Sequence, residues 1–152
     1  MDSSHIPLVI AIVILIVGSA YFSATETAFS SLNRIRMKNM AADGNKRAQL
    51  ALDMADQYDR LLSTILIGNN IVNICSTSIA TVLFIAWFGS STGPTLSTVV
   101  MTVLVLIFGE ISPKSLAKES PEKFAMFSAP ILRIFLTILA PLNFLFGQWK
   151  KL

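Results

Sequence analysis

The sequence predicts an all-α membrane protein with three transmembrane helices, short cytoplasmic helices and a belt-like juxtamembrane helix. Of its 152 residues, 53% are hydrophobic and only 14% are charged, whereas a soluble domain carries about 25% charged residues. Three apolar stretches are long enough to cross a bilayer, which takes about 20 residues of helix. They cover residues 6–29, 61–88 and 94–112.

The first stretch, residues 6–29, is predicted to be a retained span rather than a cleaved secretory signal. Small residues at 18–20 follow its apolar core, as they do at a cleavage site. A signal peptide also needs a basic segment before the apolar core, and residues 1–5 contain neither lysine nor arginine. We therefore expect the segment to remain in the protein.

The distribution of lysine and arginine predicts which loops face the cytoplasm. Residues 30–60 contain six basic residues and residues 113–123 contain three, whereas the turn at 89–94 has no charge. Basic residues are enriched in cytoplasmic loops. We therefore expect 30–60 and 113–123 inside, with the N-terminus and 89–94 outside a plasma or bacterial inner membrane. Helical spacing of the charges predicts two short amphipathic helices in the first cytoplasmic segment, over 34–42 and 45–59.

A fourth apolar stretch is interpreted as a bent helix over residues 124–149, lying at the cytoplasmic interface with Trp149 as an anchor. A full crossing would place the lysines at 150 and 151 outside, against the pattern of the other loops. Two prolines would kink the helix, and Arg133 would be costly in the middle of a lone span. A kinked fourth span remains the alternative.

Glu110 is the most informative single residue. The third apolar stretch runs directly into the segment Gly109-Glu110-Ile111-Ser112-Pro113-Lys114, which predicts a helix broken by glycine and proline with a carboxylate at the break. Ionisable side chains at membrane depth are rare and commonly mark ion or proton pathways. This pattern predicts a cation site.

The other two spans each carry polar residues on one helical face. Residues at i, i+4, i+7 and i+11 share a face, and Asn70 falls off the stripe. The two stripes consist of Ser19, Ser23, Glu26 and Ser30, and of Asn69, Asn73 and Ser76.

These side chains offer oxygen ligands, which Mg²⁺ and Ca²⁺ prefer. Transition metals favour histidine or cysteine, and the chain has one of each, His5 and Cys75. The single cysteine also excludes an intrachain disulfide. We therefore expect a metal site formed by six residues of the three spans: Ser19, Ser23, Asn69, Asn73, Glu110 and the carbonyl of Gly109.

A structural explanation of the same residues stays open. Serine, asparagine and glycine in membrane helices often serve only interhelical packing and hydrogen bonding. Glu26, near the cytoplasmic end of its helix, is a candidate partner for Arg34, and Lys114 is a candidate partner for Glu110.

Three motifs resemble the membrane domain of the CorC/CNNM family, also called the DUF21 or cyclin-M domain. They are Phe22-Ser23-Ala24-Thr25-Glu26-Thr27-Ala28, Gly68-Asn69-Asn70-Ile71-Val72-Asn73, and Gly109 to Lys114. The resemblance covers nearly the whole chain. It implies a homodimeric Mg²⁺ transporter, associated with Mg²⁺ export and coupled to Na⁺, with three spans and a juxtamembrane belt.

The resemblance also bears on individual positions. It places the family's small polar residues on Ser19 and Ser23, its second motif on Gly68, Asn69 and Asn73, and its third on Gly109, Glu110, Pro113 and Lys114. Some relatives carry a neutral residue at the position of Glu26. The family's cytosolic CBS domains, which bind ATP, are not among these 152 residues, so we expect no ATP binding here.

The residues predict a site for a hard cation, and the resemblance implies that this cation is Mg²⁺. We therefore expect Mg²⁺ transport by alternating access, without covalent chemistry and hence without enzymatic activity. Two alternatives remain. One is a membrane Mg²⁺ sensor or regulatory module that binds the ion without moving it. The other is a Na⁺- or H⁺-coupled transporter of another solute that uses Glu110 as its protonatable group.

Overall fold

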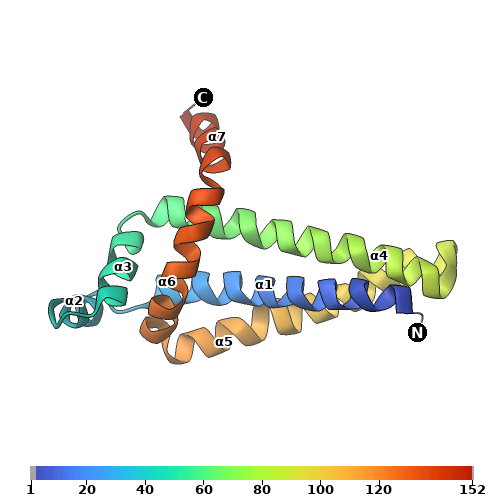
Figure 1. Ribbon diagram of the computed structural model, residues 1–152, viewed down its shortest axis with the longest axis horizontal. Helices are drawn as coiled ribbons and strands as arrows, with labels where there is room; N and C mark the ends of the chain where they lie inside the picture. Colours follow the sequence, from blue (N-terminus) through green and yellow to red (C-terminus); the bar gives the residue numbers. More distant parts are fainter. Residues whose placement is uncertain (1–2, 152) are drawn as a thin grey trace.

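The computed structural model describes residues 3–151, and the elements it assigns there are all helical, which confirms the predicted fold class (Figure 1). In chain order they are the 3-10 turn η1 (Ser3–His5), α1 (Ile6–Ser31), α2 (Arg34–Ala42), α3 (Lys46–Ala55), α4 (Tyr58–Leu104), the π-helix η2 (Val105–Ile111), α5 (Ser112–Glu119), α6 (Pro121–Ile138) and α7 (Ala140–Lys151).

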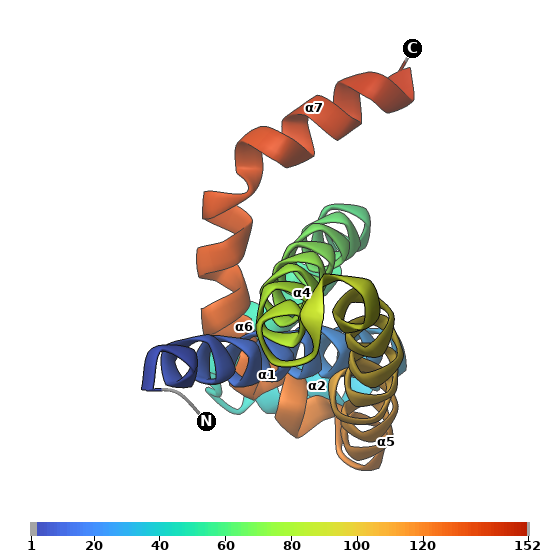
Figure 2. The ribbon, with the colours of Figure 1, turned by 90° about the vertical axis from the view of Figure 1, so that its right-hand side faces the viewer.

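Helix α4 is two antiparallel arms rather than one rod. Gly89, in its interior, has φ 87° and ψ 166°, a positive-φ conformation that glycine adopts without strain. Beyond Gly89 the chain runs back alongside the preceding helix. The hydroxyls of Thr81, before the reversal, and Ser97, after it, lie 3.3 Å apart. We call residues 58–88 the first arm and residues 90–119 the return arm. Figure 2, viewed from one end of α1, shows α1 beside both arms.

Helix α1 pairs antiparallel with the first arm. A Cβ added at Gly68 would lie 2.5 Å from the Phe22 ring, and one at Gly18 would lie 3.4 Å from Val72. At the far end, the Trp87 indole nitrogen donates to His5 Nδ1 at 3.0 Å. Residue numbers thus rise along α1 as they fall along the first arm, which fixes the register of the two helices.

Several expected boundaries need correction. A turn was expected over 89–94, but the chain reverses at Gly89 alone. The helix continues directly after Gly89 and contains Pro94. The cytoplasmic helix expected over 45–59 ends at Ala55, and α4 begins at Tyr58. Helix α2 covers the expected residues 34–42.

The return arm is continuous where a break was expected. Instead of interrupting the helix, the segment around Gly109 winds as a π-helix over Val105–Ile111, and Pro113 lies in the first turn of α5. Proline fits this position because its fixed φ of about −65° is compatible with helical backbone. The backbone therefore stays helical as far as Glu119.

Helices α6 and α7 form the predicted bent element, with a 69° bend between Ile138 and Ala140. Figure 1 shows α6 crossing the long helices and α7 projecting away from them. The Tyr21 hydroxyl donates to the carbonyl of Ser128 at 2.9 Å, which ties α6 to α1. Pro130 lies inside α6 without ending it.

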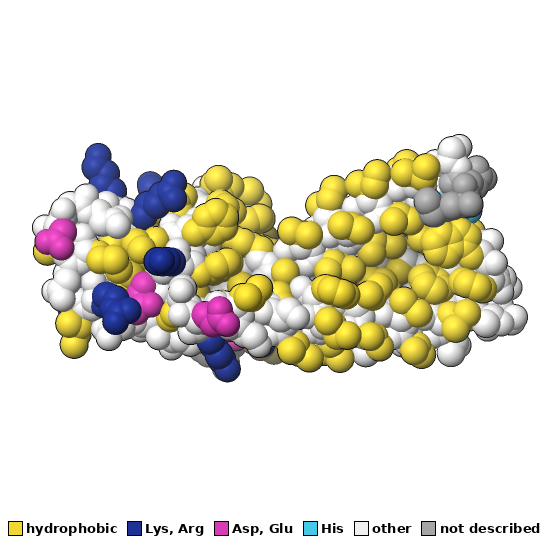
Figure 3. Space-filling model, turned by 90° about the horizontal axis from the view of Figure 1, so that it is seen from below, with side chains coloured by type: hydrophobic (Ala, Val, Ile, Leu, Met, Phe, Trp, Pro, Cys, Tyr) yellow, Lys and Arg dark blue, Asp and Glu magenta, His cyan; other side chains and the backbone are white. Residues whose placement is uncertain are grey.

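The surface is divided as a membrane protein requires. Figure 3 shows hydrophobic side chains over one half of the molecule and charged side chains gathered at the other, where α2 and α3 lie. Among the described residues, the helical stretches Ser3–Ser31 and Tyr58–Glu119 are long and apolar enough to span a bilayer. By composition alone, α6 and α7 together would make a further span.

Candidate functional site

The polar stripes of α1 and the first arm meet at Ser19 and Asn69. Ser19 is completely buried, and its hydroxyl donates to Asn69 Oδ1 at 3.1 Å. The antiparallel register set by Phe22 and Gly68 brings these two residues to the same level. Two of the six predicted site residues are therefore in direct contact.

Gly109 brings the return arm to the same point. A Cβ added to it would lie 2.9 Å from Ser19 Oγ and 3.3 Å from Ser19 Cβ, closer than side chains ordinarily pack. Glycine thus allows the backbone of η2 to approach the serine. Ser19, Asn69 and Gly109 form what we call the three-helix junction, with one residue from each long segment.

The π-helical turn around Gly109 offers a backbone oxygen. Pro113 has no N–H, so the carbonyl that it would otherwise engage in the preceding turn lacks its helical donor. In an α-helical hydrogen-bond pattern, which pairs each residue with the fourth one before it, that carbonyl belongs to Gly109. In a π-helical pattern, which pairs it with the fifth one before, the carbonyl belongs to Phe108. Single π-turns of this kind occur frequently at functional sites. The Gly109 carbonyl therefore stays a predicted ligand, and its backbone is helical rather than broken.

Asn73 lies one turn from Asn69 along the same helix. Its side-chain oxygen Oδ1 is buried and has no hydrogen-bond partner among the described residues. A buried acceptor without a donor is unfavourable by about 1–3 kcal/mol. The structural explanation that accounts for Ser19 and Asn69, a hydrogen bond between helices, does not account for Asn73.

Asn73 faces a cavity of about 250 Å³ between the first arm and the return arm. Three threonines line it as well: Thr77, Thr98 and Thr102. The sequence interpretation missed them, although Thr77 follows Asn73 by four residues and the other two are four residues apart. Each threonine hydroxyl donates to a carbonyl four residues earlier in its own helix. Their remaining lone pairs make the cavity wall polar.

The side chains of the remaining predicted residues form no hydrogen bond with the three-helix junction among residues 3–151. Ser23 is buried one turn from Ser19, toward α2, and Glu110 is half-buried directly after Gly109. The Ser76 hydroxyl donates to the carbonyl of Asn73, a local bond that accounts for its burial. Asn70 is exposed, as expected for a residue off the stripe.

Two proposed ion pairs are wrong. Arg34 binds Asp56 at 3.0 Å rather than Glu26, and its guanidinium also donates to the carbonyl of Ala55. Within residues 3–151, Glu110 forms no salt bridge with Lys114. Both glutamates, half-buried and free of salt bridges in this part of the chain, keep their acceptor oxygens available.

Acidic, histidine and cysteine side chains do not cluster. In the described part of the chain, no group of three or more of them is arranged to hold a metal ion. A cation at the three-helix junction would therefore depend on hydroxyl, amide and carbonyl oxygens, with Glu110 as the nearest carboxylate in sequence. Such a ligand set suits a hard cation.

Known proteins with similar sequences identify the family. Residues 10–151 match the model of the cyclin M transmembrane N-terminal domain. A UPF0053 protein of Haemophilus influenzae is 41% identical over 99% of this chain. The UPF0053 inner membrane protein YfjD of Escherichia coli is 39% identical over 88% of it. The polyamine export protein of Haemophilus influenzae is 28% identical over 91% of it.

The match covers a limited part of these relatives. This chain corresponds to 36% of the first protein, 31% of the second and 35% of the third, so it spans about a third of their length. The agreement extends over the α1, α4 and η2 segments that build the three-helix junction, since the family model covers residues 10–151. The chain therefore belongs to the cyclin M family of membrane proteins, matching its transmembrane N-terminal domain.

Proposed function

We propose that this domain transports Mg²⁺ across the membrane, as Na⁺-coupled export, through a dehydrated-ion site at the three-helix junction. The observation that carries the proposal is the buried, unpartnered Oδ1 of Asn73, one helical turn from the contact of Ser19 with Asn69. Ser23, Gly109 through its carbonyl, and Glu110 complete the proposed ligand set. Membership of the cyclin M family supports a role in transport.

The spacing of the junction oxygens suits Mg²⁺. Two adjacent ligands of an octahedral ion, each about 2.1 Å from the metal, lie about 3.0 Å apart. Ser19 Oγ and Asn69 Oδ1 are 3.1 Å apart, which is close to that spacing. To bind an ion, the Ser19 hydroxyl would have to rotate its proton away from Asn69 Oδ1. Ca²⁺, with ligands at 2.3–2.6 Å, would require a wider spacing in the same geometry.

The charge of the site suits cargo rather than a permanent structural ion. A single carboxylate, Glu110, leaves a bound divalent cation with net positive charge, which favours release once the site opens. We propose that the site opens to one side of the membrane at a time. The basic residues of α2 and α3 support a cytoplasmic location for that end of the bundle and an external N-terminus. We also propose that the protein works as a homodimer.

The decisive experiment compares two asparagines of one helix. Asn73→Leu removes the unpartnered oxygen and keeps the branching and the number of side-chain heavy atoms, whereas Asn70→Leu makes the same change at an exposed position three residues earlier. The protein is reconstituted in liposomes that contain a fluorescent Mg²⁺ indicator. We expect Asn73→Leu to lower the Mg²⁺ flux about tenfold or more, the size of effect seen when metal-site groups are removed. Asn70→Leu should retain the flux.

The remaining arms test charge and coupling. Glu110→Gln keeps the shape of the side chain and removes its charge, so it should reduce Mg²⁺ flux while the protein still folds. An opposing Na⁺ gradient should accelerate Mg²⁺ export. Equal flux in the Asn73 and Asn70 variants, together with an unaffected Glu110→Gln variant, would show that the ion does not pass through this junction.

Two alternative functions give different results in the same vesicles. A sensor would bind Mg²⁺, detected as Mg²⁺-dependent thermal stabilisation, without any flux. An organic-cation exporter is suggested by the name of the polyamine export relative, and an ammonium group can also bind carboxylate and amide oxygens. In that case spermidine flux would depend on Asn73 and Glu110, and Mg²⁺ flux would be absent.

A further inference from the structure

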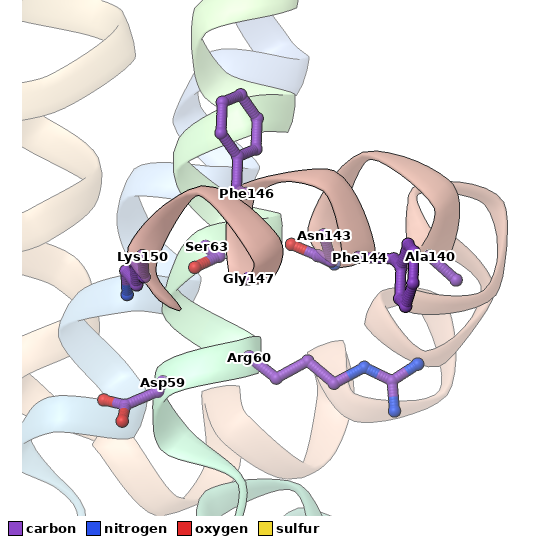
Figure 4. Close-up of a pocket in the computed structure, with 9 residues that line it drawn as sticks. All are labelled: Asp59, Arg60, Ser63, Ala140, Asn143, Phe144, Phe146, Gly147 and Lys150. Atoms are coloured by element: carbon purple, nitrogen blue, oxygen red, sulfur yellow. The ribbon is translucent and has the colours of Figure 1, made fainter. Parts of the chain in front are cut away.

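A second cavity lies at the opposite side of α4, and none of the three residues of the three-helix junction lines it. It has a volume of about 490 Å³ and separates the start of the first arm from α7 (Figure 4). This volume lies within the range of small-molecule binding sites. Its polar lining comes from Asp59, Arg60 and Ser63 of α4 and from Asn143 and Lys150 of α7, and its aromatic lining from Phe144 and Phe146.

The cavity has an excess of positive charge. Arg60 and Lys150 line it against one acid, Asp59, and within residues 3–151 neither basic side chain forms a salt bridge. Arg60 also lines a neighbouring hollow of about 160 Å³ together with Arg133 and Asp53. Unpaired guanidinium and ammonium groups at a cavity wall favour an anionic ligand, with phosphate a good match for both.

A hydrogen bond holds α7 at the edge of this cavity. Asn143 Nδ2 donates to Thr64 Oγ1 at 2.6 Å, and this bond orients the amide. The other end of the same amide, Asn143 Oδ1, is buried without a hydrogen-bond partner in the described part of the chain. The cavity therefore offers an acceptor as well as two cations, which suits a ligand that carries both a phosphate and a donor group.

The surroundings indicate where that ligand comes from. Helix α7 exposes Phe144 at 66% and Trp149 at 76% of their surfaces, next to the lysines at 150 and 151. Aromatic and basic side chains together on a short helix are typical of the boundary between lipid headgroups and acyl chains. A ligand with a phosphate headgroup and an apolar tail would fit both parts of this region.

We propose that the cavity between α4 and α7 binds the headgroup of an anionic phospholipid such as phosphatidylglycerol, from the leaflet at the α2–α3 end. Its phosphate binds Arg60, a glycerol hydroxyl donates to Asn143 Oδ1, and its acyl chains lie along the aromatic side chains of α7. Lys150, on the other side of the cavity (Figure 4), adds positive charge that favours the anionic headgroup. The lipid thereby fastens α7 to the first arm. This site is independent of the proposed Mg²⁺ site and of its function.

Native mass spectrometry of the detergent-solubilised protein tests the proposal by titration with dioleoyl phosphatidylglycerol or dioleoyl phosphatidylcholine. We expect phosphatidylglycerol to bind more tightly. Each basic residue near an anionic membrane surface contributes roughly a fivefold change in affinity. The double variant Arg60→Gln/Lys150→Gln should therefore lose about 25-fold, whereas Asp59→Asn should gain about fivefold.

The control Lys46→Gln removes one exposed charge from the start of α3, outside the cavity. It should leave the affinity for phosphatidylglycerol unchanged. Equal binding of the two lipids, or equal losses in Lys46→Gln and Arg60→Gln, would overturn the proposal. Saturation by inorganic phosphate at concentrations that displace the lipid would reveal a site for free anions instead. The Asp59→Asn arm remains informative if the double variant does not fold.

Discussion

Gly109→Ala is the sharpest structural test of the three-helix junction. The new methyl group would lie 2.9 Å from Ser19 Oγ and 3.3 Å from Ser19 Cβ. To restore ordinary contact, either the serine hydroxyl must rotate away from Asn69 or the return arm must move outward by a few tenths of an ångström. Overpacking of this kind destabilises a protein by about 1–3 kcal/mol, and the lost interhelical hydrogen bond contributes about 0.6 kcal/mol of that.

The matched control is Gly18→Ala, on α1 one residue before the serine. Its Cβ would meet only Val72 at 3.4 Å, an ordinary contact. Both variants gain the same helix propensity, roughly 1 kcal/mol, so the difference between them isolates the clash. We expect Gly109→Ala to be less stable than Gly18→Ala by about 1–3 kcal/mol. The free energy of unfolding is measured by dodecyl sulfate titration in mixed micelles, followed by circular dichroism.

A double-mutant cycle identifies the atom responsible. Ser19→Ala removes the hydroxyl that the new methyl group would strike, so Ser19→Ala/Gly109→Ala should be more stable than the sum of the single effects predicts. Mg²⁺ flux should fall in Gly109→Ala and persist in Gly18→Ala. Equal stability and equal flux in the two glycine variants would refute the close approach of the return arm to α1.

Three further outcomes are expected. Tyr21→Phe removes the 2.9 Å hydrogen bond to the Ser128 carbonyl and should lower the free energy of unfolding by about 0.5–1.5 kcal/mol. An unchanged free energy of unfolding would mean that this bond does not stabilise the packing of α6 on α1. Thr64→Val removes the acceptor of Asn143, so hydrogen exchange should rise in residues 140–151 and not in α1; uniform exchange would contradict an anchoring role. Arg34→Gln breaks an exposed pair with Asp56 and should shift stability by less than about 1 kcal/mol, with the shift smaller still at high salt.

The sequence predicted those parts of the fold that depend on local pattern. Apolar length located the long helices, the uncharged turn marked the reversal near Gly89, and the prolines with Arg133 indicated a bent helix rather than a straight span. Each of these features acts within one or two turns of its own position. The positions of the described helices follow them closely, apart from their ends.

The arrangement at the junction depended on information that no single segment contains. Gly109 and Pro113 led to the prediction of a broken helix, because both residues are common where helices end. In the structure Gly109 lies in a π-helix and Pro113 in the first turn of α5, and the sequence alone does not reveal that π-helix. Arg34 had Glu26 nearby in sequence, yet Asp56 reaches it from α3 through the tertiary fold. Helical spacing put Ser19 and Asn69 on polar faces, but their contact follows from the register between α1 and α4.

The fit of the Phe22 ring against Gly68 limits how these helices can move. The Phe22 ring packs against the backbone of the first arm at Gly68, in space that a side chain at position 68 would occupy. Sliding α1 by one residue would displace the ring by about 1.5 Å along the first arm, toward residues that have side chains. In the proposed transport cycle we therefore expect α1 and the first arm to move together, and the return arm to move relative to them.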